Sequence, residues 1–206
     1  MKIIKLLFVI ITTLLLSSQT YVFAQTNNTL DYLVLNTGDT LYGTVKYIDI
    51  SGATPKYYKK IRLTDTYNHS HKYLRKDVSA FRVNNTNYEG FWLNQSSQNV
   101  MVLNSKYEIN PKNGEKYFLK VVSKGTLNHY ELEWWEQGES ALSWMDLLKK
   151  EEDPFFIRAT QGILGLKRNV LINYFSNCPD LKEQIKKKQL NKVWEVVDYY
   201  NSNCIY

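Results

Sequence analysis

Residues 99–136 of the chain, NVMVLNSKYEINPKNGEKYFLKVVSKGTLNHYELEWWE, contain two turn signals separated by apolar runs. The first turn signal extends from Pro111 to Gly114, and the second is Lys124–Gly125. The runs between them are short and rich in valine, tyrosine, phenylalanine and leucine, which is the composition of β-strands. This stretch therefore predicts antiparallel strands joined by tight turns.

The segments before this stretch predict more strands of the same kind. Residues 31–50 show alternating apolar side chains on both sides of a hairpin turn at Asn36–Asp39. Three further segments have strand patterns: 57–66, 71–85 and 86–93. The segment 71–85 has the pattern of two short strands on either side of Lys76–Asp77. A total of about six to nine short antiparallel strands favours a small barrel, a roll or a sandwich.

Residues 140–166 fit more than one secondary structure. The segment ALSWMDLLKK (141–150) can form an amphipathic helix, or a strand that alternates Leu142, Trp144 and Leu148. Its length is compatible with both. The segment PFFIRATQGILGL (154–166) has the pattern of a hairpin that turns at Gln161–Gly162. We favour strands in both segments.

After Lys167 the apolar period becomes helical. Three helical faces are predicted, formed by Val170, Leu171, Tyr174 and Phe175, by Leu181 and Ile185, and by Leu190, Val193, Trp194 and Val197. Because no low-complexity linker precedes these helices, we expect them to pack against the sheet. The predicted fold class is α+β, with an antiparallel β-rich region at 25–166 and a C-terminal cap of two or three helices at 167–206.

The N-terminus has the three parts of a secretory signal peptide. Lys2 and Lys5 precede an apolar run from Leu6 to Leu16, and a polar stretch then ends in Val22-Phe23-Ala24. The small or aliphatic residues at the end of this stretch predict cleavage between Ala24 and Gln25. An uncleaved membrane anchor is not favoured, because the apolar run is short and contains Thr12 and Thr13. No second apolar run of spanning length follows, so the mature chain is expected to lack a transmembrane span.

The charge of the chain argues against nucleic acid as a partner. Removing residues 1–24 takes away two lysines and no acidic residue, which lowers the formal net charge from +6 to +4. The remaining lysines and arginines are interspersed with acidic residues, so the basic stripe that nucleic-acid binding requires is missing. Anionic polymers of an envelope or lipid headgroups fit this mild positive charge better.

The chain has two cysteines, Cys178 and Cys204. Pro179 favours the first helical position, so Cys178 would be a helix N-cap, where a thiol can become a reactive thiolate. Metal binding and free structural thiols are alternatives, but CxxC and His/Cys ligand spacings are absent. In an exported chain with two cysteines we predict a disulfide, because both flank the same pair of short helices.

Two other clusters contain residue types that bind ligands. His69 and His71 are two residues apart, as a metal pair requires, but they lie in a polar turn sequence without a third ligand, so no metal site is predicted. The segment NHYELEWWEQGE (128–139) is the main aromatic and acidic cluster. On a strand, Tyr130, Leu132 and Trp134 would share one face, and Glu131, Glu133 and Trp135 would share the other.

Three interpretations of this aromatic and acidic cluster stay open. An exposed tryptophan beside two carboxylates can stack on a sugar ring, so Tyr130, Glu131, Glu133, Trp134 and Trp135 are candidate ligand contacts. Paired carboxylates also serve glycoside hydrolysis, and a strand with a buried aromatic face is the structural alternative. The sequence has no glycine-rich phosphate loop, no serine elbow and no HExxH helix, so no catalytic residue and no cofactor is predicted.

Five segments resemble a group of uncharacterised exported proteins of Bacteroidetes-type bacteria: NTGDTLYGTVKY (36–47), YLRKDVSAFRV (73–83), YFLKVVSKG (117–125), YFSNCPDLKEQI (174–185) and YYNSNC (199–204). In longer members of that group a similar segment precedes an outer-membrane β-barrel, which implies an envelope role. The resemblance supports the cysteine pair and supplies no activity.

We expect an exported, non-enzymatic protein, located in the periplasm or at the outer membrane of a Gram-negative bacterium. Its partner would be another envelope component, either an outer-membrane protein or a glycan. The alternative is a carbohydrate or small-ligand binding module that uses the Trp134–Trp135 region.

Overall fold

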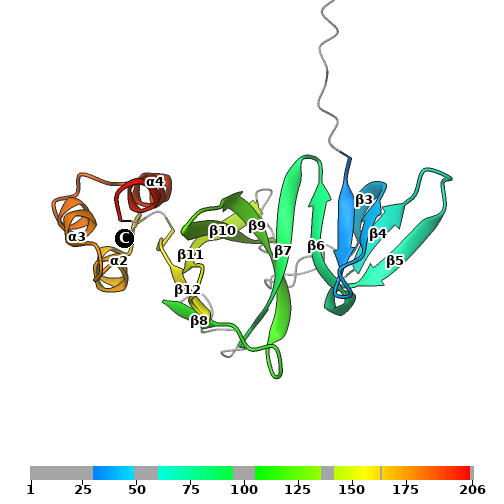
Figure 1. Cartoon of the computed structure of the whole chain (residues 1–206), viewed down its shortest axis with the longest axis horizontal. Coiled ribbons are helices and arrows are strands. Elements are labelled where there is room, and N and C mark those ends of the chain that lie inside the picture. The colour runs from blue at the N-terminus through cyan, green and yellow to red at the C-terminus, as the bar shows by residue number, and fades with distance from the viewer. Residues whose placement is uncertain (1–29, 49–59, 95–104, 136–141, 163, 205–206) are drawn as a thin grey trace, which may run out of the picture.

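The computed structural model describes residues 30–48, 60–94, 105–135, 142–162 and 164–204. They form three parts, which lie side by side in Figure 1: an N-terminal sandwich of two sheets, a barrel and a helical cap. The predicted α+β fold with a β-rich region followed by helices is therefore confirmed. The predicted signal peptide and its predicted cleavage position lie outside the described residues.

The barrel is made of six antiparallel strands, in the spatial order β7, β9, β10, β11, β12 and β8. Their bounds are Thr86–Leu93 for β7, Lys106–Glu108 for β8, Glu115–Ser123 for β9, Leu127–Trp135 for β10, Leu142–Lys150 for β11 and Phe155–Arg158 for β12. The segment that can be helix or strand is thus strand β11.

Strand β8 returns to β7 and closes the ring that Figure 1 shows. A β-bridge joins Leu93 to Ile109. Next to it the Asn94 amide donates to the Glu108 carbonyl over 3.0 Å, and the Asn110 amide donates to the Trp92 carbonyl over 2.7 Å. The sequence alternatives of barrel, roll and sandwich are resolved in favour of a barrel for this part, because the last strand of the sheet meets the first one again.

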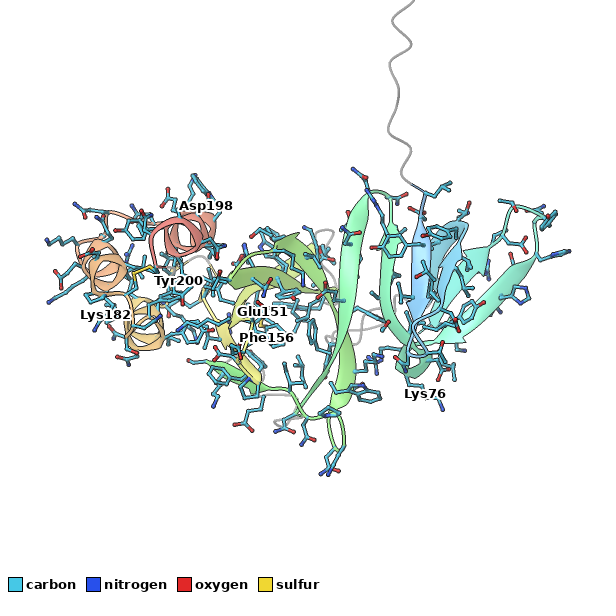
Figure 2. All side chains as sticks on the ribbon, viewed as in Figure 1. Lys76, Glu151, Phe156, Lys182, Asp198 and Tyr200 are labelled. Atoms are coloured by element: carbon cyan, nitrogen blue, oxygen red, sulfur yellow. A yellow bond between two sulfur atoms is a disulfide. The ribbon has the colours of Figure 1, made fainter. Side chains whose placement is uncertain are left out.

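The barrel interior is an apolar core of aromatic and aliphatic side chains. Its buried members are Leu93, Tyr107, Tyr117, Leu119, Tyr130, Leu132, Met145, Leu147 and Phe156. Phe91, Tyr130 and Phe156, the last of which is labelled inside the barrel in Figure 2, contact one another edge to face, with ring centroids 4.9 to 5.4 Å apart. Such aromatic packing adds about 1 kcal/mol per pair to the burial of the rings themselves.

The N-terminal sandwich consists of six strands and one short helix: β1 Tyr32–Leu35, β2 Thr40–Tyr42, β3 Thr44–Ile48, β4 Lys60–Thr64, β5 Ser70–Leu74, η1 Arg75–Asp77 and β6 Val78–Val83. Strands β2, β1 and β6 extend the large sheet from β7, whereas β3, β4 and β5 form a second sheet. The chain changes sheet at Gly43, where a Cβ atom would lie 2.3 Å from the Thr64 carbonyl oxygen. Glycine is therefore required at this bend.

Three helices form the cap: α2 Arg168–Tyr174, α3 Pro179–Lys186 and α4 Val193–Asn203. Their core includes Phe175, Leu181 and Val197, and it continues onto the outer face of the barrel through Leu127 of β10 and Leu148 of β11. The Asn201 side chain strengthens this contact, because it accepts from the Leu127 amide and donates to the Leu127 carbonyl. The cap is thus packed on the sheet.

One predicted helical face differs from the structure. Trp194 was expected beside Val193 and Val197, but 54% of its surface is exposed. Helix α4 begins at Val193, so Leu190 precedes it and does not share its phase. The buried stripe is formed by Val193, Val196, Val197 and Tyr200. Among the described helices, none has both the length and the apolarity to cross a membrane.

Candidate functional site

Strand β10 carries the aromatic and acidic side chains that the sequence marks as candidate ligand contacts. The barrel interior receives Tyr130 and Leu132, with Trp134 packed against the same core. Glu131 and Glu133 lie on the opposite, outer face, where both contact Lys120 of β9. The predicted division of these residues between two faces is therefore confirmed for the side chains that the structure describes. The side chain of Trp135 lies outside them.

The interior position makes Tyr130 a structural residue. Its hydroxyl donates to the Glu89 carboxylate over 2.9 Å, and the Lys124 ammonium donates to the same hydroxyl over 2.6 Å. Burial, together with the Glu89 carboxylate, raises the pKa of Tyr130 far above its ordinary value. Trp134 is half-buried and packs against the same core. Tyr130 therefore offers no free ring face to a sugar, and the ring of Trp134 is partly covered.

The two carboxylates on the outer face share one ammonium group. The Lys120 Nζ atom lies 2.6 Å from Glu131 Oε2 and 3.6 Å from Glu133 Oε1. The Tyr88 hydroxyl donates to Glu133 Oε2 over 3.1 Å. Burial raises the pKa of Glu133, which is 8% exposed, although Lys120 and Tyr88 oppose this shift. Burial lowers the pKa of Lys120, but its ion pairs outweigh this and raise it.

Among the described side chains, the exposed tryptophan beside these carboxylates is Trp144. In the register of β10 and β11, Glu133 lies directly opposite Trp144, and Glu131 lies opposite Asp146. Directly opposed residues share a face, so the indole of Trp144 stands on the outer face with both carboxylates. Its exposed fraction is 57%. We call Lys120, Glu131, Glu133, Trp144 and Asp146 the Trp144 surface.

Within the Trp144 surface, the partly exposed Asp146 pairs with the buried His129. His129 Nε2 and Asp146 Oδ1 are 2.9 Å apart, and the Thr160 hydroxyl donates to Asp146 Oδ2 over 2.9 Å. The Nδ1 atom of His129 is buried and has no hydrogen-bond partner among the described residues. A histidine oriented by a carboxylate is half of a nucleophile-activating arrangement. However, the Thr160 hydroxyl donates to the aspartate and not to the histidine, so this pair does not activate that hydroxyl.

The predicted disulfide between Cys178 and Cys204 is confirmed, with Cα atoms 5.6 Å apart. Both half-cystines are buried in the core of the cap. Cys178 is also the N-cap of α3, with Pro179 in the first turn, as the sequence predicts. Because its sulfur is bonded, the alternatives of a nucleophile, a metal ligand and a free thiol are excluded in this structure.

The histidine pair near β5 lies away from the Trp144 surface. His69 is in the turn before β5, 3.4 Å from Asp65, and His71 is an exposed residue of the strand. In the part of the chain that the structure describes, no three His, Cys, Asp or Glu side chains gather as a metal site would require.

Sequence reasoning missed Trp144, Lys120 and Asp146 as members of the site. The signal that could have identified Trp144 is the alternation of Leu142, Trp144 and Leu148, which places it on the face of the outer carboxylates once β10 and β11 are paired. Comparisons with models of protein families, with curated proteins and with solved structures found no match for this chain. The interpretation of the Trp144 surface therefore depends on its own geometry.

Proposed function

We propose that this chain is an exported, non-enzymatic binding protein of the cell envelope and that it binds carbohydrate on the Trp144 surface. The observation that carries the proposal is the exposed indole of Trp144 directly across from Glu133. An exposed aromatic face stacks on the apolar face of a sugar ring, and flanking polar groups then bind its hydroxyls. Lys120, Glu131 and Asp146 are partly exposed and supply both donors and acceptors.

Binding fits these side chains better than glycoside hydrolysis. A hydrolase needs one carboxyl group as a proton donor and a second carboxylate that acts on the sugar. Here both carboxylates of β10 contact the same Lys120 ammonium, and Glu133 also accepts from Tyr88. The lysine and the tyrosine hold the two carboxylates in a fixed position, which favours recognition of hydroxyl groups.

The experiment compares Trp144→Ala with Trp194→Ala in residues 25–206. Trp194 is a matched control, because it is similarly exposed but lies on helix α4. Envelope oligosaccharides are screened on an array, and the affinity of each bound glycan is then measured by calorimetry. Trp144→Ala should weaken binding about tenfold, which corresponds to about 1.4 kcal/mol of stacking.

Two results would count against the carbohydrate proposal. The first is an array on which no envelope glycan is retained by the wild type. The second is an equal loss of affinity in Trp144→Ala and Trp194→Ala, because that would place the glycan elsewhere. Circular dichroism of both variants checks that the fold is intact.

A protein partner is the second candidate function, and the outer edge of β5 favours it. Strand β5 pairs only with β4 among the described strands, so its other edge offers unpaired backbone groups for strand addition. Leu74 at its end is 44% exposed and Tyr67 in the preceding turn is 81% exposed. Crosslinked envelope fractions should then yield a specific protein that Leu74→Asp loses and Val122→Asp retains. Repeated recovery of the chain alone would refute this candidate.

A further inference from the structure

Arg158 is a buried cation that forms no ion pair with a carboxylate of the described residues. It ends strand β12, where it lies opposite Leu147 of the barrel interior, and only 6% of its surface is exposed. None of the described carboxylates forms an ion pair with it, and its Nε atom has no hydrogen-bond partner among the described residues. Its charge acts on Tyr107, where it opposes the rise that burial causes in the pKa of that hydroxyl.

A second cation, Lys167, lies close enough to Arg158 to be affected by its charge. The Lys167 Nζ atom donates to the Ser105 hydroxyl over 3.2 Å, and the Arg158 amide donates to the Ser105 carbonyl over 2.9 Å. Burial and the positive charge of Arg158 together lower the pKa of Lys167. Two like charges therefore lie near each other at the junction of barrel and cap, without a described acidic group to balance them. Arg158 is buried and Lys167 is half-buried, so a bound anion would offset the repulsion between the two cations.

Lys167 lines a pocket of about 530 Å³ between the barrel and the cap, whereas Arg158 does not reach its wall. The described residues that line it are Ser105, Gln161, Leu164, Leu166, Lys167, Arg168, Asn169, Val170 and Lys188. Three of them are cations and none is acidic.

The three cations of the lining differ in what they already bind. The Arg168 guanidinium is fixed by the carbonyls of Ile185 and Leu190 and by Asn191, so it contributes a rigid positive charge. Lys188 forms no ion pair with a described residue. Its neighbour Lys187 lies 3.9 Å from Glu183 and does not line the pocket.

We propose that this basic pocket binds a phosphate group, held by Lys167 and Lys188 and by the hydroxyl of Ser105. Lysine ammonium groups bind phosphate as point charges, and a concave site without acids concentrates the positive potential. The fixed charge of Arg168 adds to that potential, and so does the charge of Arg158, which is near enough to lower the pKa of Lys167. The site is separate from the Trp144 surface, and the proposal does not depend on carbohydrate binding.

The test measures binding of inorganic phosphate to residues 25–206 by calorimetry at low ionic strength, with sodium chloride as the matched salt. Lys167→Met should weaken phosphate binding about tenfold, because it removes a charge-assisted hydrogen bond. Lys188→Met should weaken it about threefold or more. Lys187→Met removes the same charge from the same cap and should leave the affinity within about twofold of the wild type.

Vesicles distinguish a free phosphate ligand from a lipid headgroup. Cosedimentation with phosphatidylglycerol vesicles, but not with phosphatidylcholine vesicles, and its loss in Lys188→Met would assign the pocket to a phospholipid. Binding of inorganic phosphate without vesicle binding would assign it to a soluble phosphate compound. Because Lys188 is exposed, Lys188→Met keeps the test valid if Lys167→Met does not fold.

Two outcomes would overturn the proposal. One is the absence of saturable binding of both inorganic phosphate and phosphatidylglycerol by the wild type. The other is an equal loss in Lys188→Met and Lys187→Met, because the attraction would then come from the overall charge of the cap and not from the pocket.

Discussion

The disulfide of the cap offers a prediction whose size follows from the structure. It joins Cys178, at the N-terminus of α3, to Cys204, at the C-terminus of α4, and closes a loop with a sequence separation of 26 residues. Closing a loop of this length lowers the entropy of the unfolded chain and so raises its free energy by about 3.5 kcal/mol at 25 °C. The double variant Cys178→Ala/Cys204→Ala should therefore lose about 3.5 kcal/mol of unfolding free energy.

Urea denaturation followed by circular dichroism measures this loss. With a urea dependence of about 2 kcal/mol per molar, the midpoint should fall by about 1.8 M. Reductant should shift the wild type by a similar amount and leave the double variant unchanged, which separates the bond from the packing of the cysteine side chains. A loss of unfolding free energy below about 1 kcal/mol would refute the reasoning, because opening the loop would then not raise the conformational entropy of the unfolded chain as expected.

Two further perturbations test the ion pairs and the docking of the cap. Burial raises the pKa of the Glu133 carboxyl in the folded state above its value in the unfolded chain. As the pH rises through that folded-state pKa, the wild type therefore loses unfolding free energy. Glu133→Gln should remove this pH dependence of stability, so the wild type loses stability relative to the variant. Urea titrations at about pH 4 and about pH 8 check the sign, and a relative gain by the wild type contradicts it. Asn201→Ala leaves the Leu127 amide and carbonyl without their partner and should cost about 2 kcal/mol, measured by urea denaturation. Asn203→Ala is the control, since its side chain binds only a carbonyl within α4; an equal cost in both would refute the docking role.

Local turn chemistry made most strands of the barrel predictable. Asn110 shows why, because its side-chain oxygen accepts from the amides of Lys112 and Asn113, and its carbonyl accepts from Gly114. These contacts lie within five residues, so the sequence signal Pro111–Gly114 contains them. Closure of the barrel was not predictable in the same way. The bridge from Leu93 to Ile109 depends on the curvature of the whole sheet and not on a local pattern.

The sequence predicts which side chains of β10 share a face of the strand, but not which of the two faces is exposed to solvent. Alternation correctly divides Tyr130 from Glu131, because strand geometry has a period of two. Alternation does not indicate which face of a strand is covered by other elements. In this chain the two faces of β10 are covered by different parts of the structure. The inner face closes on the barrel core, whereas Leu127 of the outer face lies under the cap. Among the described side chains of the outer face, the exposed tryptophan is Trp144 on the neighbouring strand β11.

The position of the Trp144 surface follows from how the three parts meet. The N-terminal sandwich covers the outer face of the barrel at Tyr88 and Phe118, and the helical cap covers it at Leu127 and Leu148. Between these two covers, the described side chains of strands β9 to β11 include Lys120, Glu131 and the exposed indole of Trp144. Because none of the three apolar cores includes Trp144, its removal should change binding without a loss of packing. That independence is what allows Trp144→Ala to separate a ligand contact from a contribution to the fold.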